Sequence, residues 1–292
     1  RDLAFYEVYN YAFVGDQLLA AVGLDPADHI ALANPLASDQ NRLRTSLIPN
    51  LLKITGENLR FQKNFQCYEL ERTFAGVAQG PFDHDRFALA GIMTQKEWSK
   101  QSEQCFYALK GAVEDLFAQL PFADRLRFRP AAVVPSWGHP GRTAQLFLGE
   151  QAVGTVGQVH PQVTENLGIK AVVGFFDIDV DALLACQSAE ASFEKVQRYP
   201  TVPFDISMIC EAKTLIADVE DTIWSVDSKV KAVELFDVYM GENIGEGKKS
   251  LAFTITFAAN DHTLQPDEIT DVQQRTMQAL DAAGYKVRDG AA

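Results

Sequence analysis

A carboxylate and an aromatic ring stand two residues apart at Asp237 and Tyr239, at the end of an apolar run. Successive side chains of a β-strand point to opposite faces, so residues two apart share a face. A carboxylate can accept two hydrogen bonds from the Watson-Crick edge of guanine, and an aromatic ring suits stacking on an unstacked base. The pair could therefore bind single-stranded RNA. The alternative is that both side chains only solvate an exposed sheet face.

The strand that carries this pair is expected over residues 233–239, and a second strand is expected over residues 249–257. In the second strand, apolar residues alternate strictly with small or hydroxylated ones, which is typical of a half-buried strand. The link over residues 241–247 contains three glycines, which favours a hairpin loop. The two strands should pair antiparallel.

Further elements are expected on both sides of this hairpin. Residues 204–210 alternate as a strand does, and an amphipathic helical stretch follows them. Pro266 and two acidic residues after it open a second helix, because proline and negative charge fit a first turn. Gly284 ends that helix, and residues 285–288 form a short last strand. The order strand, helix, strand, strand, helix, strand predicts a ferredoxin-like βαββαβ domain.

Alternation along the strands then assigns the two faces of the predicted sheet. The face toward the helices should carry Phe236, Val238, Leu251, Phe253, Ile255, Ile206, Met208 and Val287. The other face should carry Asp237, Tyr239, Ser250, Thr254, Thr256, Asp205, Ser207 and Arg288. The second set describes an open, polar sheet face with a single prominent aromatic side chain.

The run LFDVYMGENIGEGKKSLAFTITF, followed by HTLQPDEI, resembles the C-terminal anticodon-binding domain of the phenylalanyl-tRNA synthetase β-subunit family. In that family, a strand ending in D-x-Y leads through a glycine-rich loop to K-K-S-L-A-F. The open sheet face of the family holds the anticodon loop of tRNA(Phe), and its tyrosine stacks on a base. The resemblance implies that role for Tyr239, with Asp237, Ser250 and Arg288 as the polar readers around it.

The preceding part of the chain mixes strand and helix patterns. Strands are expected at residues 7–13, 66–74 and 87–93 and near positions 143, 153 and 172, and helices at residues 49–58 and 106–120. Strands in such number, with helices between them, predict an α+β domain built on a largely antiparallel sheet. An Ala- and Ser-rich stretch at residues 185–194 is the best linker candidate. The expected domains are residues 1–190 and residues 191–292.

Five segments of the first domain also resemble the β subunit, in order along the chain. They are YEVYNYAFV, NPLASDQNRLRTSLIPNLL, FYALKGAVEDLF, HPGRTAQLFLGEQAVGTVGQVHP and FFDIDVDALL. The family assigns this region the fold of a class II synthetase catalytic domain. The resemblance therefore covers nearly the whole chain.

A working class II site needs arginines that clamp ATP phosphates and stabilise the charge that develops as the adenylate forms. The strand at residues 66–74 offers Glu69, Glu71 and Arg72, but Ala75 and Gly76 follow it. Residues 173–179 contain acidic side chains and no arginine. The domain is expected to be noncatalytic, without catalytic or metal-ligating residues, as the resemblance also implies.

The resemblance implies partners as well. In the family, this noncatalytic copy packs against a catalytic α subunit that binds phenylalanine, ATP and magnesium, and the two chains form a heterotetramer. No cofactor is therefore expected in this chain. Without its partner, the chain should expose apolar surface and either bind α subunit or self-associate. The alternative function is a free-standing ferredoxin-like binding or assembly module that does not recognise RNA.

Composition limits these hypotheses. The net charge of −13 over 292 residues predicts weak nonspecific attraction to phosphates, because that attraction comes from Lys and Arg. Four separated cysteines indicate neither a zinc site nor a disulfide framework, and they favour a reducing cytoplasm. No apolar run is long enough to cross a bilayer. The start at Arg1, without Met or a signal pattern, suggests a piece of a longer chain.

Four further side chains could attract a functional interpretation. Arg44 and Arg142 are expected to be buried partners of carboxylates rather than RNA contacts. His139 and His160 are each followed by proline, and their spacing matches no compact metal site. Both histidines are expected to be structural.

Overall fold

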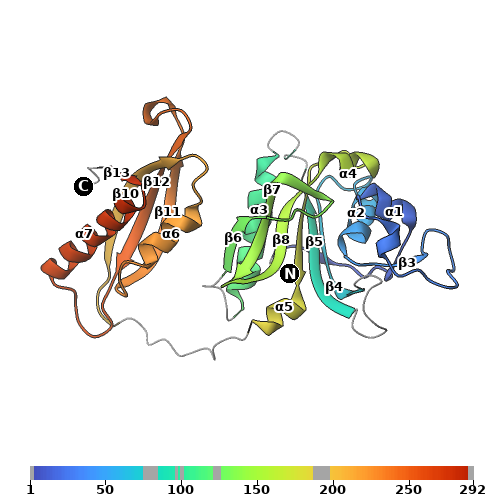
Figure 1. Cartoon of the computed structure of the whole chain (residues 1–292), viewed down its shortest axis with the longest axis horizontal. Coiled ribbons are helices and arrows are strands. Elements are labelled where there is room, and N and C mark those ends of the chain that lie inside the picture. Colours follow the sequence, from blue (N-terminus) through green and yellow to red (C-terminus); the bar gives the residue numbers. More distant parts are fainter. Residues whose placement is uncertain are drawn as a thin grey trace. The chain divides into compact units, whose positions relative to one another are not determined.

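The computed structural model describes residues 3–74, 85–95, 98, 102–120, 126–186 and 198–288. Contacts within the chain divide it into two compact units, Arg1–Ala191 and Ser192–Ala292, which we call unit 1 and unit 2 (Figure 1). Most of the stretch expected to be a linker lies outside the described residues.

Unit 1 is built on a seven-stranded sheet with the order β1-β4-β5-β9-β8-β7-β6. The strands are β1 (Tyr6–Glu7), β4 (Phe65–Phe74), β5 (Asp85–Thr94), β6 (Leu126–Pro130), β7 (Gly138–Leu148), β8 (Gln151–Val159) and β9 (Val173–Asp179). Strand β1 runs parallel to β4, and the other neighbouring strands are antiparallel. The largely antiparallel α+β sheet predicted from the sequence is confirmed.

Helices cover both faces of this sheet. They are α1 (Asp16–Ala21), α2 (Ile48–Asn58), α3 (Glu103–Ala118), α4 (Pro161–Asn166) and α5 (Val180–Ala185). Helix α2 packs against one face, in a core that includes Phe175 of β9. Helix α3 packs against the other face, in a core that includes the next residue, Phe176. Strand alternation thus supplies both cores, because neighbouring residues point to opposite faces.

The strand predicted over residues 7–13 is instead two short strands, β1 and β2 (Phe13–Val14), and β2 pairs with β3 (Arg42–Leu43). Between them the chain turns aside to contact Glu69. The backbone N–H of Asn10 donates to Oε1 of Glu69 at 3.0 Å, and its side-chain amide donates to Oε2 at 2.8 Å. A continuous strand would leave the buried carboxylate of Glu69 without these two donors.

Unit 2 has the predicted ferredoxin-like order. Its elements are β10 (Val202–Glu211), α6 (Ile216–Trp224), β11 (Val230–Tyr239), β12 (Lys248–Phe257), α7 (Pro266–Ala282) and β13 (Lys286–Val287). The four strands form one sheet in the order β11-β12-β10-β13. Both helices pack on the same face, through a core that joins Phe253 of β12 to Ile223 of α6 and Val272 of α7.

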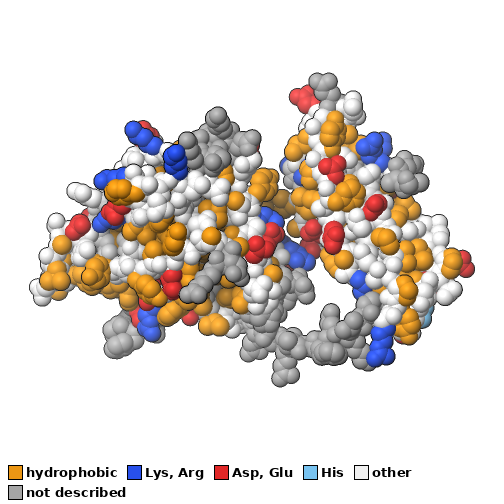
Figure 2. All heavy atoms as spheres, turned by 180° about the vertical axis from the view of Figure 1, so that it is seen from behind, with side chains coloured by type: hydrophobic (Ala, Val, Ile, Leu, Met, Phe, Trp, Pro, Cys, Tyr) orange, Lys and Arg blue, Asp and Glu red, His pale blue; other side chains and the backbone are white. Residues whose placement is uncertain are grey.

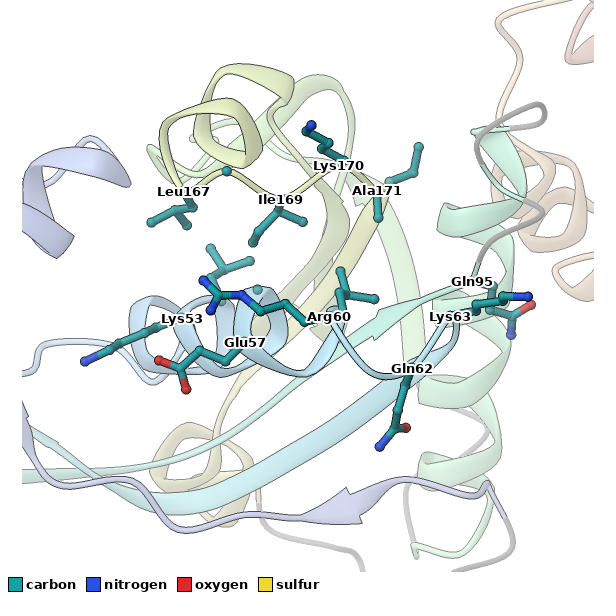
Figure 3. A pocket seen from close by; sticks show the side chains of 15 residues that line it. Lys53, Glu57, Arg60, Gln62, Lys63, Gln95, Leu167, Ile169, Lys170 and Ala171 are labelled. Atoms are coloured by element: carbon teal, nitrogen blue, oxygen red, sulfur yellow. The ribbon is translucent and has the colours of Figure 1, made fainter.

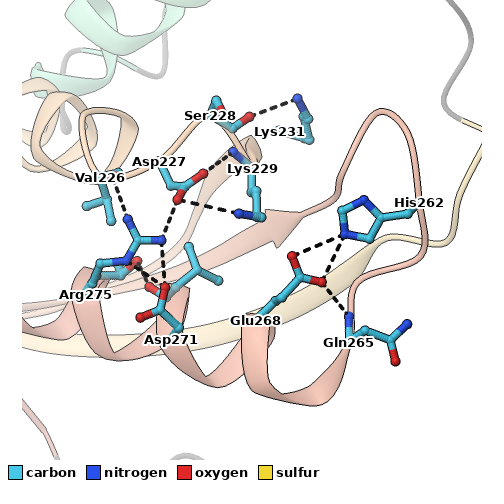
Figure 4. A network of polar contacts seen from close by, with 12 residues as sticks. Val226, Asp227, Ser228, Lys229, Lys231, His262, Gln265, Glu268, Asp271 and Arg275 are labelled. Atoms are coloured by element: carbon cyan, nitrogen blue, oxygen red, sulfur yellow. Dashed lines mark hydrogen bonds and ion pairs between the residues drawn. The ribbon is translucent and has the colours of Figure 1, made fainter.

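Polar contacts fix the start and middle of α7 (Figure 4). The Gln265 side chain and Glu268 form a capping box, in which Glu268 accepts from the backbone N–H of Gln265 at 3.0 Å. His262 also contacts the Glu268 carboxylate, with Nε2 3.0 Å from Oε2. Farther along, Arg275 pairs with Asp227 in the loop before β11 and with Asp271 on its own helix. These contacts lie on helix and loop segments and leave the opposite sheet face free.

The predicted faces of unit 2 are correct with one exception. Phe236 was expected to face the helices, but its side chain is 59% exposed. Strand β11 contains an irregularity between Leu235, opposite Phe253, and Asp237, opposite Ala252. This β-bulge inserts one extra residue into β11, so residues two apart no longer share a sheet face across it. Leu235 and Val233 pack on the core in place of Phe236.

Candidate nucleic-acid interface

The uncovered face of the unit 2 sheet carries the residues that the sequence singled out. Tyr239 at the end of β11 lies opposite Ser250 of β12, and Ser250 lies opposite Ile209 of β10. Ile209 in turn lies opposite Lys286 of β13. The four strands therefore present one row of side chains that runs across the sheet from Tyr239 to Lys286.

A second row runs beside the first. Asp237 lies opposite Ala252, and Ala252 lies opposite Ser207. Arg288 continues the row, because its backbone N–H donates to the carbonyl of Ser207 at 2.9 Å. Asp237 and Arg288 stand on the two edge strands, three strand spacings or roughly 14 Å apart. One base cannot contact both side chains, whereas a loop that crosses the sheet can.

The four predicted site residues differ in accessibility. Asp237, Tyr239 and Arg288 are exposed, but Ser250 is buried, with 7% of its surface accessible. Tyr239 and Ser250 are direct cross-strand neighbours. The structure thus brings Asp237, Tyr239 and Ser250 together at one corner of the face and places Arg288 at the opposite edge.

The Tyr239 ring lies against the backbone of Gly241. A Cβ atom added at Gly241 would lie 2.2 Å from the Tyr239 hydroxyl oxygen and 2.5 Å from the ring carbon that bears it. Such a distance is far below a van der Waals contact. A residue without a side chain at position 241 therefore permits the orientation that the Tyr239 ring adopts.

Charge is distributed unevenly across the face. The β11 edge carries Glu234 and Asp237, and the β13 edge carries Lys286 and Arg288. Between the edges, the Asp205 carboxylate accepts a hydrogen bond from the Thr254 hydroxyl at 2.6 Å. The acidic edge suits hydrogen-bond donors on bases, and the basic edge suits phosphates.

Unit 1 contains a separate hollow of about 780 Å³ between α2 and the segment that joins α4 to β9 (Figure 3). Leu52, Leu59, Leu167, Ile169, Ala171 and Val172 form its apolar lining. Lys53, Arg60, Lys63 and Lys170 also line it, and the Arg60 side chain extends between Glu57 and Leu167. The arrangement could hold an anionic group. No predicted site residue lines this hollow.

The acidic residue Glu69, noted on the strand of unit 1, is fully buried. Its Oε1 accepts from Nη1 of Arg44 at 2.8 Å, and both side chains are almost completely inaccessible. The prediction that Arg44 partners a carboxylate is confirmed. Among the described residues the same prediction for Arg142 is wrong, because Arg142 donates there to the Ser102 hydroxyl at 2.6 Å and to the Gln158 amide oxygen at 2.7 Å, which are both neutral groups.

A second acidic residue lies on the same sheet face as Glu69. Asp177 on β9 is opposite Ala90 of β5, which is opposite Glu69. Desolvation raises the pKa of the Asp177 carboxyl to about 6, although the Ser46 hydroxyl donates to it at 3.2 Å. Arg72 projects from the other face of β4 and pairs with Asp85 at 2.8 Å.

Cysteine and histidine side chains form no metal site in the described ranges, where no three His, Cys, Asp or Glu residues are grouped to hold an ion. Burial raises the pKa of Cys67 and of Cys105 to about 12. His139 accepts from the backbone N–H of Gly141, and His160 accepts from that of Gln162. These histidine contacts stabilise local turns. Within the same ranges, every helix is too short or too polar to span a membrane.

Comparison with known protein families shows which family models the two units match. Residues 1–180 match the phenylalanyl tRNA synthetase beta chain CLM domain, and residues 197–288 match the ferredoxin-fold anticodon binding domain. The chain belongs to the phenylalanyl-tRNA synthetase beta chain family. The resemblance found in its sequence is thereby confirmed for both halves.

Individual relatives agree with this family assignment. The phenylalanine–tRNA ligase beta subunit of Halalkalibacterium halodurans is 30% identical over 98% of this chain and 36% of its own length. That of Syntrophus aciditrophicus is 33% identical over 97% of this chain and 37% of its own length. The chain spans a little over a third of these relatives.

Among solved structures, a pyrrolysyl tRNA synthetase from Desulfitobacterium hafniense is similar over 67% of this chain and 69% of its own. The TM-score is 0.48 and the sequence identity is 14%.

Proposed function

We propose that this chain is a noncatalytic part of the β subunit of phenylalanine–tRNA ligase and that its unit 2 binds the anticodon loop of tRNA(Phe). The observation that carries the proposal is the corner formed by Asp237, Tyr239 and Ser250 on the uncovered sheet face. This corner lies in a domain that matches an anticodon-binding family. Sequence-specific recognition of RNA usually targets unstacked loop bases, which such a face can receive.

Each side chain has a distinct role in the proposed complex. Tyr239 stacks on an unstacked base, which contributes roughly 1–3 kcal/mol to binding. Asp237 accepts hydrogen bonds from the Watson-Crick edge of a guanine. Arg288, at the far edge, pairs with a phosphate of the same loop. Ser250 is buried beside Tyr239 and supports the corner where the base sits.

The acidic sheet face of unit 1 supports the proposed noncatalytic role. Glu69 is held by Arg44 and Asn10, and Asp177 lies two strands away on the same face. The Asp177 carboxylate would repel a triphosphate, and Arg44, a cation on that side of the sheet, is already paired with Glu69. The α subunit supplies the site for ATP, magnesium and phenylalanine, and the two chains assemble into a heterotetramer. Unit 1 docks on the α subunit.

A second candidate function is a ferredoxin-like binding module that no longer recognises RNA. The net charge of −13 favours it, because an acidic chain gains little from phosphate contacts. The two candidates differ at Asp237 and Tyr239. Substitutions there weaken RNA binding in the first case and have no binding effect in the second.

Titration of a labelled tRNA(Phe) anticodon stem-loop with the 292-residue chain at low salt tests the proposal. Binding should prefer the cognate loop and should fall roughly tenfold or more in Tyr239→Ala. Tyr107→Ala is the matched control, since Tyr107 is an exposed tyrosine of unit 1. Equal affinity of the wild-type chain and Tyr239→Ala would contradict the proposal. If the stem-loop binds only when α subunit is present, the complex of this chain with the α subunit supplies part of the affinity.

A further inference from the structure

The β-bulge in β11 changes which side chains the open face presents. Leu235 faces Phe253 on the helix side, and the next paired residue, Asp237, faces Ala252 on the open side. Phe236 is the extra residue between them. In a bulge, two residues of one strand oppose a single residue of the other. Phe236 has no partner of its own in this register, and it is absent from the core on the helix side, to which Leu235 contributes.

The exposure of Phe236 agrees with this geometry. Phe236 is 59% exposed on an edge strand, while the flanking residue Leu235 packs on the core. In the part of the chain that the structure describes, neither Phe236 nor Tyr239 has another aromatic ring as a stacking partner. Two aromatic side chains on one edge are thus free to receive a planar ligand, with Asp237 between them.

We propose that Phe236 forms a second base-binding platform, beside Asp237 and separate from Tyr239. The proposal rests on the proposed function and extends it to a second unstacked nucleobase. Aromatic side chains bind unstacked bases through their ring faces, whatever the base. The exposed Phe236 ring thus supplies affinity, and the neighbouring Asp237 carboxylate supplies selection among bases through hydrogen bonds.

The spacing of the platforms constrains the RNA that they bind. Phe236 and Tyr239 are three residues apart, or roughly 10 Å along a strand. Bases that remain stacked follow one another at about 3.4 Å. Two adjacent stacked bases cannot cover both rings. The loop must open so that one base lies on each ring. The face therefore binds more tightly to a loop whose bases are separated than to a strand whose bases remain stacked.

The test uses the full chain and tRNA(Phe) anticodon stem-loops that carry 2-aminopurine at one loop position at a time, since stacking quenches its fluorescence. Phe236→Leu keeps an apolar side chain of similar bulk on the edge and removes the ring, and Phe236→Trp keeps a ring. Phe61→Leu is the matched control, because Phe61 is 88% exposed in unit 1. Urea unfolding of each variant reports whether the fold is intact.

Phe236→Leu should lower affinity by roughly fivefold to a hundredfold, while Phe236→Trp and Phe61→Leu should bind as the wild-type chain does. Emission should rise at one loop position in Phe236→Leu and at a different position in Tyr239→Ala. If Tyr239→Ala weakens binding but Phe236→Leu does not, the second platform is wrong and the proposed function stands. Emission changes at the same position in both variants would also overturn it. If the wild-type chain binds neither alone nor with α subunit present, the proposed function fails, and this inference fails with it.

Discussion

The ion pair of Arg44 and Glu69 is the most deeply buried charged contact described, with 2% and 0% of the side chains accessible. Replacing Arg44 with Met would leave the Glu69 carboxylate buried without its cation. Breaking one side of a buried pair costs about 3–5 kcal/mol. Urea unfolding in a Trp224→Phe background, where the two remaining tryptophans lie in unit 1, should report a loss of this size. A loss below about 1 kcal/mol would contradict the structural role of the pair.

Asp177 should destabilise unit 1 at neutral pH. Its pKa in the folded chain is raised from 3.8 to about 6, so folding favours the protonated carboxyl. Stability is therefore lost as the pH rises from about 4 to about 6 and stays constant above that window. Asp177→Asn, which mimics the neutral acid, should stabilise unit 1 by roughly 1–3 kcal/mol at pH 7.

The comparison that checks this is urea unfolding of the wild type and Asp177→Asn at pH 4 and at pH 7, in the same Trp224→Phe background. The two chains should unfold alike at pH 4 and differ at pH 7. A variant that is less stable than the wild type at pH 7 would instead indicate that the ionised carboxylate contributes to the fold.

At the residue scale, strand alternation was enough to predict Asp237, Tyr239 and Arg288 on the open face. Strand alternation predicted the wrong face for Phe236, because the bulge inserts a residue that interrupts the alternation and no local sequence signal marks the bulge. Nor could it predict the burial of Ser250, which depends on what neighbouring side chains cover. A carboxylate partner was predicted for Arg44, without naming Glu69. The described partners of Arg142 are instead neutral groups on distant segments.

At the scale of elements, the β11-β12 hairpin positions the Tyr239 ring through Gly241. A methyl group at position 241 would overlap the far end of the Tyr239 side chain. The ring can swing away, so Gly241→Ala should leave the fold intact and lower affinity for the anticodon stem-loop several-fold. Titration and thermal unfolding of the variant check this together. Gly111→Ala in α3 is the matched control, because a Cβ atom there meets no neighbouring atom.

The start of α7 should respond to pH through His262. Asp261 and Glu268 raise the pKa of His262 above 6.5, and hydrogen bonds from the Gln265 backbone and His262 lower the pKa of Glu268 below 4.5. The contribution of His262 is therefore complete below about pH 6.5 and is lost as the pH rises through its raised pKa. The stabilising contribution of Glu268 to the helix start is present above about pH 4.5 and is lost at lower pH.

Hydrogen exchange of α7 peptides in the wild type and His262→Gln measures this effect. The variant should exchange faster than the wild type at pH 5.5, and the difference should shrink at pH 8.5. A difference of equal size at both pH values would show that protonation of His262 contributes nothing to the helix start.

The long elements could be predicted because their patterns are local. The alternation in β10 and β12 and the proline-initiated helices α2 and α7 appear in the structure close to their expected bounds. Short elements could not be predicted in the same way. Helices α1, α4 and α5 each have six residues, too few to display a periodic stripe, and their form depends on packing against the sheet.

At the scale of the whole molecule, exposed aromatic side chains predict a partner-binding surface on unit 1. Tyr6, Tyr9 and Tyr11 are 62%, 72% and 74% exposed, at and just after the edge strand β1. Hydrophobic side chains also lie among charged ones on the surface of each unit (Figure 2). Tyrosine is enriched at protein interfaces. The three tyrosines are the expected contact with the α subunit, or with a second copy of the chain when that subunit is absent.

Replacing all three tyrosines with Ser should weaken α-subunit capture at least tenfold and should reduce self-association in sedimentation experiments. Tyr107→Ser is the control, because Tyr107 is 67% exposed on α3. Unchanged capture by the triple variant would place the α-subunit contact elsewhere on unit 1.

The family and the α+β organisation of both units could be predicted from the whole sequence, since runs such as LFDVYMGENIGEGKKSLAFTITF are long and unusually spaced. The hollow lined by Lys53, Arg60, Lys63 and Lys170 could not be predicted from the sequence. Lys170 joins the other cations only because the segment after α4 packs beside α2. Contacts between distant segments leave no periodic signal in the sequence.

Binding of the anticodon loop to the open face of unit 2 can be followed through the backbone amide resonances of the isotope-labelled chain while an anticodon stem-loop is added. We expect shifts in β11 and β12 around Asp237, Tyr239 and Ala252, with smaller shifts at Arg288, and no change in α6, α7 or unit 1. Shifts confined to the helix side of unit 2 or to unit 1 would contradict it.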